Sequence, residues 1–104
     1  MNKKQKEIME KEFKVNEHFS IKRSDYEGMP CAMLAWTWSD ERMTELAKTI
    51  SKNLLEWNPS DIEGMEDDFW KTMEDEAVHM GMEYYEDMED KQIESLENDW
   101  KKVS

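Results

Sequence analysis

The feature that most constrains the fold is a regular apolar stripe in the middle of the chain. Apolar residues recur there at three- and four-residue intervals, namely Met43, Leu46, Ala47, Ile50, Leu54 and Trp57. This spacing places them on one face of an α-helix that needs a core to cover it. Ser39 or Asp40 is suited to begin the helix, because a short side-chain oxygen accepts from its first free backbone N–H groups. Pro59 ends it.

Two further helices are expected beyond Pro59. Ser60-Asp61-Ile62-Glu63 has the form of a capping box. A helical stripe then continues through Ile62, Met65, Phe69, Met73, Ala77, Met80, Tyr84 and Met88, which predicts one long helix over about 61–88. Asp90 is suited to begin a last helix with the apolar face Ile93, Leu96, Trp100 and Val103. Whether the two helices are continuous stays open.

The first part of the chain predicts a short helix and a β-hairpin. Residues 3–15 are amphipathic at helical spacing, and residues 19–23 alternate between apolar and polar as a half-buried strand does. Residues 24–30 hold Asp, Gly and Pro, which are typical of a turn, and a second strand is expected at 31–38. That strand is apolar on both faces, so either helices cover one face of the sheet or a second copy supplies more strands. We favour the second alternative, a homodimer.

The expected fold class is therefore α+β and dominated by helices, in one domain over residues 1–104. A short N-terminal helix, a hairpin and two or three helices follow one another. The segment 77–85 adds a second apolar face through Val78, Met82 and Tyr85, beyond the main stripe. A helix that is apolar on two sides calls for a further packing partner, either the last helix or another subunit.

The charge of the chain is divided unequally along its length. Residues 1–58 carry 10 basic and 10 acidic side chains, whereas residues 59–104 carry 4 basic and 16 acidic ones, so the whole net charge of −12 lies in the second part. Such a field repels nucleic acid and anionic lipid, and attracts basic protein surfaces or cations. We therefore expect neither direct nucleic-acid binding nor membrane binding, and we favour a basic partner protein.

No motif in the sequence predicts an enzyme or a cofactor. Phosphate loops, dinucleotide fingerprints, nucleophile elbows and paired cysteines are all missing. Cys31 with His18 is a poor nucleophile pair, because an apolar strand would raise the pKa of the thiol. A single cysteine, no apolar leader and no apolar stretch of roughly 20 residues favour a cytoplasmic protein without membrane spans.

One spacing in the acidic part is compatible with a metal site. Glu76, His79 and Glu83 would share one face of the expected long helix, in the Glu-x-x-His spacing of di-iron carboxylate proteins. The second such motif that those proteins need is absent, and a carboxylate near a histidine is common in so acidic a segment. The acidic runs also lack the residue order of a calcium loop. No metal or cofactor is therefore assigned.

Two functions remain open. The first is a non-catalytic acidic module that binds a basic, nucleic-acid-binding surface of a partner through Glu63, Glu66, Asp67, Trp70, Glu74, Asp75, Tyr85 and Glu86. In size, acidity and lack of a catalytic motif, the chain resembles the small inhibitors, DNA mimics included, that phages and mobile elements use. The second is a small oligomeric domain with a structural or regulatory role, with a metal at Glu76, His79 and Glu83.

Overall fold

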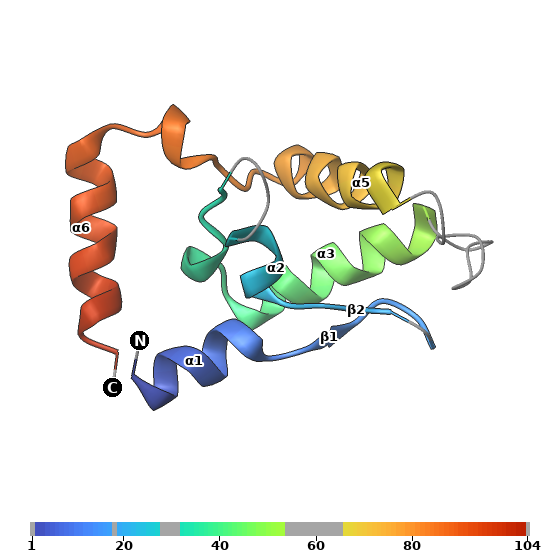
Figure 1. The fold of residues 1–104 in the computed structure, drawn as a ribbon, viewed down its shortest axis with the longest axis horizontal. Helices are drawn as coiled ribbons and strands as arrows, with labels where there is room; N and C mark the ends of the chain where they lie inside the picture. Colours follow the sequence, from blue (N-terminus) through green and yellow to red (C-terminus); the bar gives the residue numbers. More distant parts are fainter. Residues whose placement is uncertain (1, 18, 28–31, 54–65, 104) are drawn as a thin grey trace. The chain divides into compact units, whose positions relative to one another are not determined.

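The computed structural model of the chain describes residues 2–17, 19–27, 32–53 and 66–103. The fold is α+β and dominated by helices, with a short N-terminal helix, a two-stranded antiparallel hairpin and several later helices (Figure 1), which confirms the predicted fold class. Two compact units are present. The terminal unit comprises Met1–Lys11, Lys22–Trp38 and Met82–Ser104, and the central unit comprises Glu12–Ile21 and Ser39–Gly81. The prediction of one domain stays a prediction.

The best-predicted element is helix α3 (Asp40–Asn53) in the central unit. It begins where the sequence indicated, because the Ser39 hydroxyl oxygen accepts from the backbone N–H of Arg42 at 3.2 Å. The described part of the apolar stripe, Met43, Leu46, Ala47 and Ile50, is buried. Leu54 and Trp57 lie outside the described residues.

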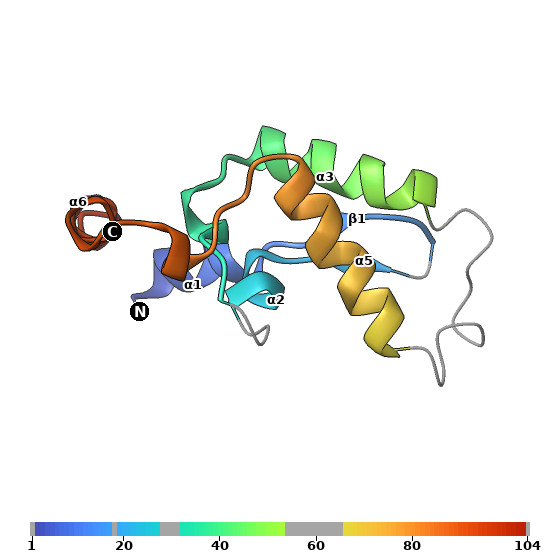
Figure 2. The same cartoon turned by 90° about the horizontal axis from the view of Figure 1, so that it is seen from above.

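Helix α5 (Glu66–His79) packs against α3 and runs obliquely to it (Figure 2). Its buried face consists of Phe69, Met73 and Ala77, as the stripe predicted. The prediction that this helix extends to residue 88 is wrong, because α5 ends at His79. Gly81 follows with a φ of 101°, a left-handed conformation that favours glycine and ends helices. The capping box at 60–63 lies outside the described residues.

The hairpin of the central unit is formed by β1 (Phe13–Lys14) and β2 (Ser20–Ile21), with Phe13 paired to Ile21. Phe13 and Ile21 are buried, and β1 packs against α3. The first predicted strand, at 19–23, is therefore correct only over two residues, and the predicted helix at 3–15 is too long. The hairpin exists, but its partner strand precedes β2 in the chain instead of following it.

The terminal unit contains α1 (Lys3–Glu10), α2 (Arg23–Glu27), the 3-10 helices η1 (Ala35–Thr37) and η2 (Tyr85–Asp87), and α6 (Asp90–Lys101). Residues 23–27 are thus helical where a turn was expected. The predicted strand at 31–38 is also wrong, since within 32–38 one isolated antiparallel bridge, Met33 to Tyr84, leads into η1. The reason given for a homodimer is therefore removed, and the oligomeric state stays a prediction.

A buried arginine joins three segments of the terminal unit. Arg23 is 2% exposed, and its Nε and Nη2 atoms donate to the carbonyl oxygen of Trp38 at 3.1 and 2.9 Å. Its Nη1 atom donates to the carbonyl oxygen of Ile8, at the end of α1, at 3.0 Å. These bonds satisfy main-chain acceptors that the helices leave free.

Helix α6 is joined to α1 by two long-range hydrogen bonds. The Asn2 amide donates to the carbonyl oxygen of Val103 at 2.6 Å, and the Gln5 amide donates to that of Trp100 at 2.8 Å. The end of α6 therefore lies beside the beginning of α1 (Figure 1). The helices α5 and α6 are separate, which answers the question that the sequence left open.

Candidate binding sites

The predicted partner-binding residues on α5 include a solvent-facing stripe opposite its buried face. Asp67 and Asp75 are exposed, Glu74 is half-buried, and Trp70 is 41% exposed. Val78, which was expected to pack as part of a second apolar face, is also 41% exposed. In 100° steps, Asp67, Glu74 and Val78 fall on one side of the helix, with Trp70 and Asp75 at its two edges. This set is the outer face of α5.

Two of the other predicted partner-binding residues do not belong to this face. Tyr85 and Glu86 lie in η2 of the terminal unit, because α5 ends before them. Tyr85 is half-buried and hydrogen-bonded, and its expected position on the same helix as Trp70 is wrong, whereas its role in partner binding stays a prediction. Glu66 is the first residue of α5, and Glu63 lies outside the described residues.

The predicted metal site at Glu76, His79 and Glu83 required one continuous helix through all three residues, and α5 ends before Glu83. Glu76 and His79 lie in the last turn of α5, but Glu83 comes after Gly81 and does not continue that helical face. Among the described residues, no group of three or more His, Cys, Asp or Glu side chains is arranged to hold a metal ion. Cys31 and His18 lie outside the described residues.

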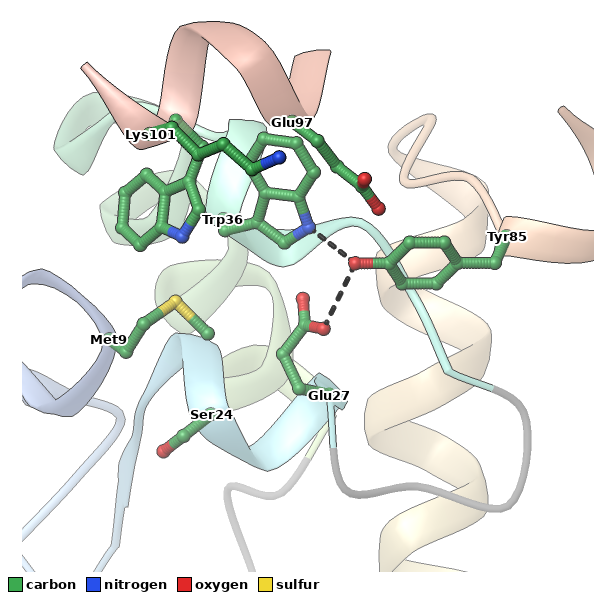
Figure 3. A pocket seen from close by; sticks show the side chains of 8 residues that line it. Met9, Ser24, Glu27, Trp36, Tyr85, Glu97 and Lys101 are labelled. Carbon is green, nitrogen blue, oxygen red and sulfur yellow. Dashed lines mark hydrogen bonds between the residues drawn. The ribbon is translucent and has the colours of Figure 1, made fainter. Parts of the chain in front are cut away.

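A second candidate site, which the sequence did not predict, is a pocket of about 380 Å³ in the terminal unit (Figure 3). Five elements contribute to its wall: α1, α2, η1, η2 and α6. The lining residues are Met9, Ser24, Glu27, Trp36, Tyr85, Glu97, Trp100 and Lys101. Apolar and aromatic groups thus form most of the wall, and a few polar groups converge on it, as in small-molecule sites.

A chain of hydrogen bonds crosses the pocket from η1 to α2. The Trp36 indole N–H donates to the Tyr85 hydroxyl oxygen at 2.6 Å, and the Tyr85 hydroxyl donates to Oε2 of Glu27 at 3.4 Å (Figure 3). Tyr85 is held in place because residues 83–85 pair with residues 32–34: Leu34 N–H donates to Glu83 O at 2.9 Å, and Tyr85 N–H donates to Ala32 O at 3.2 Å. The order of donors makes Glu27 the final acceptor.

Glu27 is the polar group that this pocket perturbs most. Burial raises the pKa of its carboxyl from 4.5 to about 7, although the backbone N–H groups of Trp36 and Ala35 and the Tyr85 hydroxyl act in the opposite direction. Its Oε1 atom is buried, and among the described residues no donor meets it with hydrogen-bond geometry. The pocket therefore holds a carboxyl group that is partly charged near neutral pH and incompletely satisfied.

Two aromatic rings and two further charges complete the pocket. The Trp36 and Trp100 rings lie 5.8 Å apart, centroid to centroid, at 40° to each other. Glu97 and Lys101, one helical turn apart on α6, place one negative and one positive group at the wall. With Glu27 ionised, the formal charge of the lining is therefore negative.

Sequence reasoning missed this pocket because its residues come from five separated segments. Its one local signal was the concentration of aromatic residues, and Tyr85 alone was selected from it. Among the described residues, no helix is long and apolar enough to cross a membrane. Comparison of the chain with known protein families, with curated proteins and with solved structures gave no significant match. The two candidate binding sites are therefore the outer face of α5 and the pocket of the terminal unit.

Proposed function

We propose that the chain is a non-catalytic, acidic protein-interaction module that occupies a basic, nucleic-acid-binding surface of a partner protein. The observation that carries this proposal is the outer face of α5, where Asp67 and Asp75 are exposed and the indole of Trp70, at one edge of the face, is 41% exposed. Exposed tryptophan among charged residues is the composition of an interface centre with a polar rim.

The two kinds of side chain have different effects on binding. Carboxylates steer a basic partner toward the surface and increase the association rate, but exposed charges add little affinity. Covering the exposed part of one indole, on the order of 100 Å², contributes about 2.5 kcal/mol. Trp70 is therefore expected to supply affinity, and the acids are expected to supply selectivity for basic surfaces.

The charge distribution supports a partner that normally binds nucleic acid. All of the excess negative charge lies in residues 59–104. The described acids of α6, Asp90, Glu94, Glu97 and Asp99, are exposed, as are Asp67, Asp68 and Asp75 of α5. Proteins that bind nucleic acid carry the opposite field on their binding surfaces. An inhibitor with this charge competes with nucleic acid for the same surface, as phage and mobile-element inhibitors do.

A matched pair of charge reversals tests the proposal. The test variant is D67K/D75K on α5, and the control is E41K/E45K on α3. The four acids that these two variants replace are all exposed. Each variant changes one acid in the first turn of a helix and one that forms a surface ion pair, Asp75 with Lys71 at 3.6 Å or Glu45 with Lys48 at 3.5 Å. The two variants therefore change net charge equally and remove similar contacts.

The assay captures partner proteins from a cell extract on the immobilised chain at about 50 mM and about 500 mM salt, since high salt screens exposed charges. Captured proteins are then challenged with duplex DNA. We expect capture that DNA and salt reverse, that D67K/D75K and Trp70→Ala abolish, and that E41K/E45K retains. Capture that is unchanged in D67K/D75K would refute the assignment of this face. A metal-dependent oligomer with no basic partner would instead favour the structural role.

A further inference from the structure

We propose that the pocket between α1, α2, η1, η2 and α6 is a binding site for an organic cation, specifically an alkylated ammonium ion with at least one N–H group. The juxtaposition of Trp36, Trp100 and Tyr85 with the Glu27 carboxyl carries this inference. It concerns the terminal unit and is independent of the function proposed for the outer face of α5.

The aromatic wall favours a cation with apolar substituents. The face of an indole attracts a positive charge, and an ammonium ion that carries alkyl groups also buries apolar area against it. Trp36 and Trp100, whose ring centroids are 5.8 Å apart, both line the pocket. The Met9 thioether is also in the lining (Figure 3). A volume of about 380 Å³ accommodates a small organic ion.

Glu27 specifies the charge and the N–H group. Its Oε2 atom already accepts from Tyr85, whereas no donor among the described residues meets its buried Oε1 atom with hydrogen-bond geometry, although the backbone N–H groups of Trp36 and Ala35 act on the carboxyl. An unsatisfied buried acceptor costs stability, and a cationic N–H donor would satisfy it and neutralise its charge together. A quaternary ammonium ion has no N–H to give, so it is expected to bind more weakly than a tertiary one.

A metal ion fits this pocket less well than an organic cation. Calcium and magnesium sites are built mainly from carboxylate, carbonyl and water oxygens, whereas most of this wall is apolar and aromatic. The searched, described part of the chain also contains no cluster of metal-ligating side chains. Aromatic rings and a methionine are suited to an alkyl group instead.

Lys101 gives the proposal a second, opposite test. Its ammonium group also lines the pocket, on the same side as Glu97, and it repels a bound cation. Replacing it by methionine keeps most of the aliphatic chain and removes the charge. Lys101→Met is therefore expected to bind the cation more tightly, whereas Glu27→Gln is expected to bind it more weakly.

Binding is expected to depend on pH because the cation pairs with the ionised form of Glu27. With a pKa of about 7, the carboxyl is mostly charged at pH 8 and mostly neutral at pH 6. Affinity is therefore expected to fall about tenfold between these pH values. The groups facing Glu27 are Tyr85 from η2 and Glu97 and Lys101 from α6, and burial raises the pKa of Tyr85 above 10.0, away from this range.

The experiment uses isothermal titration calorimetry on the full chain with three probes of nearly equal shape. They are N,N-dimethylethanolammonium, which has one N–H; choline, which has none; and 3-methylbutan-1-ol, the neutral analogue of the first. Expected dissociation constants for the first probe are on the order of 1 mM at pH 8, as for a small ligand. Choline is expected to bind more weakly, and the alcohol weakest of all.

Variants separate binding at the pocket from general attraction to an acidic protein. Glu94→Gln is the matched control, because Glu94 is an exposed carboxylate on α6 that does not line the pocket. Glu27→Gln is expected to lose at least tenfold in affinity at pH 8 and to show no pH dependence, while Glu94→Gln behaves as the unmodified chain. Circular dichroism melts establish that each variant is folded. The indole N–H signals of Trp36 and Trp100 in NMR spectra report where the probe binds.

Three results would overturn the proposal. The first is equal binding of the alcohol and of its cationic analogue, which would make the pocket a neutral apolar site. The second is unchanged binding in folded Glu27→Gln. The third is an equal loss in Glu27→Gln and Glu94→Gln, which would reduce the effect to net charge.

Discussion

Replacing Glu27 by glutamine is expected to stabilise the protein at pH 8 and to have little effect at pH 4.5. The carboxyl titrates at 4.5 without burial and at about 7 in the folded chain. A group whose pKa is raised by folding destabilises the fold once it must ionise, so the cost appears between pH 4.5 and pH 7 and persists above it. Glutamine has nearly the same shape and never ionises.

The size of the effect follows from the size of the shift. The full difference of pKa corresponds to about 3 kcal/mol. Because the Glu27 side chain is only half-buried, water screens part of its charge, and we expect about 1–2 kcal/mol at pH 8. Such a change raises the melting temperature of a chain of this length by about 4–10 °C.

Urea unfolding at pH 4.5, 6 and 8 measures this quantity directly, provided that one cooperative transition is seen. The difference in unfolding free energy between Glu27→Gln and the unmodified chain should grow with pH, and Glu94→Gln should show no such trend. A constant difference, or a loss of stability at pH 8, would mean that the Glu27 carboxyl is not destabilised in the folded state and would refute the reasoning.

Three further predictions concern individual contacts. Arg23→Met is expected to cost about 2–4 kcal/mol in urea unfolding, because it removes the buried hydrogen bonds to Trp38 O and the half-buried one to Ile8 O. Arg42→Met, which loses an exposed bond to Met80 O, should cost less than about 1 kcal/mol. Gly81→Ala is expected to cost about 1 kcal/mol in the same assay, because its φ of 101° strains any side chain. Tyr85→Phe removes a donor to Glu27 and is expected to raise the pKa of that carboxyl further in an NMR titration, and an unchanged pKa would contradict the hydrogen bond.

The raised pKa of Glu27 and the unsatisfied Oε1 atom are difficult to explain as contributions to stability. A glutamine or an apolar residue would cost less at this position, so the carboxyl is energetically unfavourable where it lies. Such groups concentrate at functional sites. The Glu27 carboxyl is therefore better explained as part of a binding site than as a contribution to stability.

The sequence by itself determined the elements whose signals are local. The stripe from Met43 to Ile50 and the Ser39 cap specify α3, because helical spacing and a capping oxygen act within a few residues. The stripe Ile93, Leu96 and Trp100 likewise lies in α6, and the division of charge is a property of the sequence alone. The helix-dominated α+β class followed from these signals.

Tertiary structure determined the secondary structure of segments whose local sequence signals are ambiguous or absent. Residues 31–38 were expected to form a strand because they are apolar on both faces, yet the described residues 32–34 pair with 83–85 and 35–37 turn into η1. The helical stripe continued past Gly81 in the sequence, but the left-handed backbone there ends α5 and sends Met82 into a buried position. The pairing of residues 32–34 cannot be read from the spacing of apolar residues, because its partner segment lies about fifty residues away. The end of α5, in contrast, has a local cause in the conformation of Gly81.

The pocket is the clearest case of this second kind. Its eight lining residues come from five elements, and no two elements give a recognisable motif by themselves. The sequence supplied a glutamate, three aromatic residues and a lysine, all with ordinary properties. Only the fold brings the glutamate out of water and beside the aromatic rings, because burial and hydrogen-bond partners are consequences of contacts between distant segments.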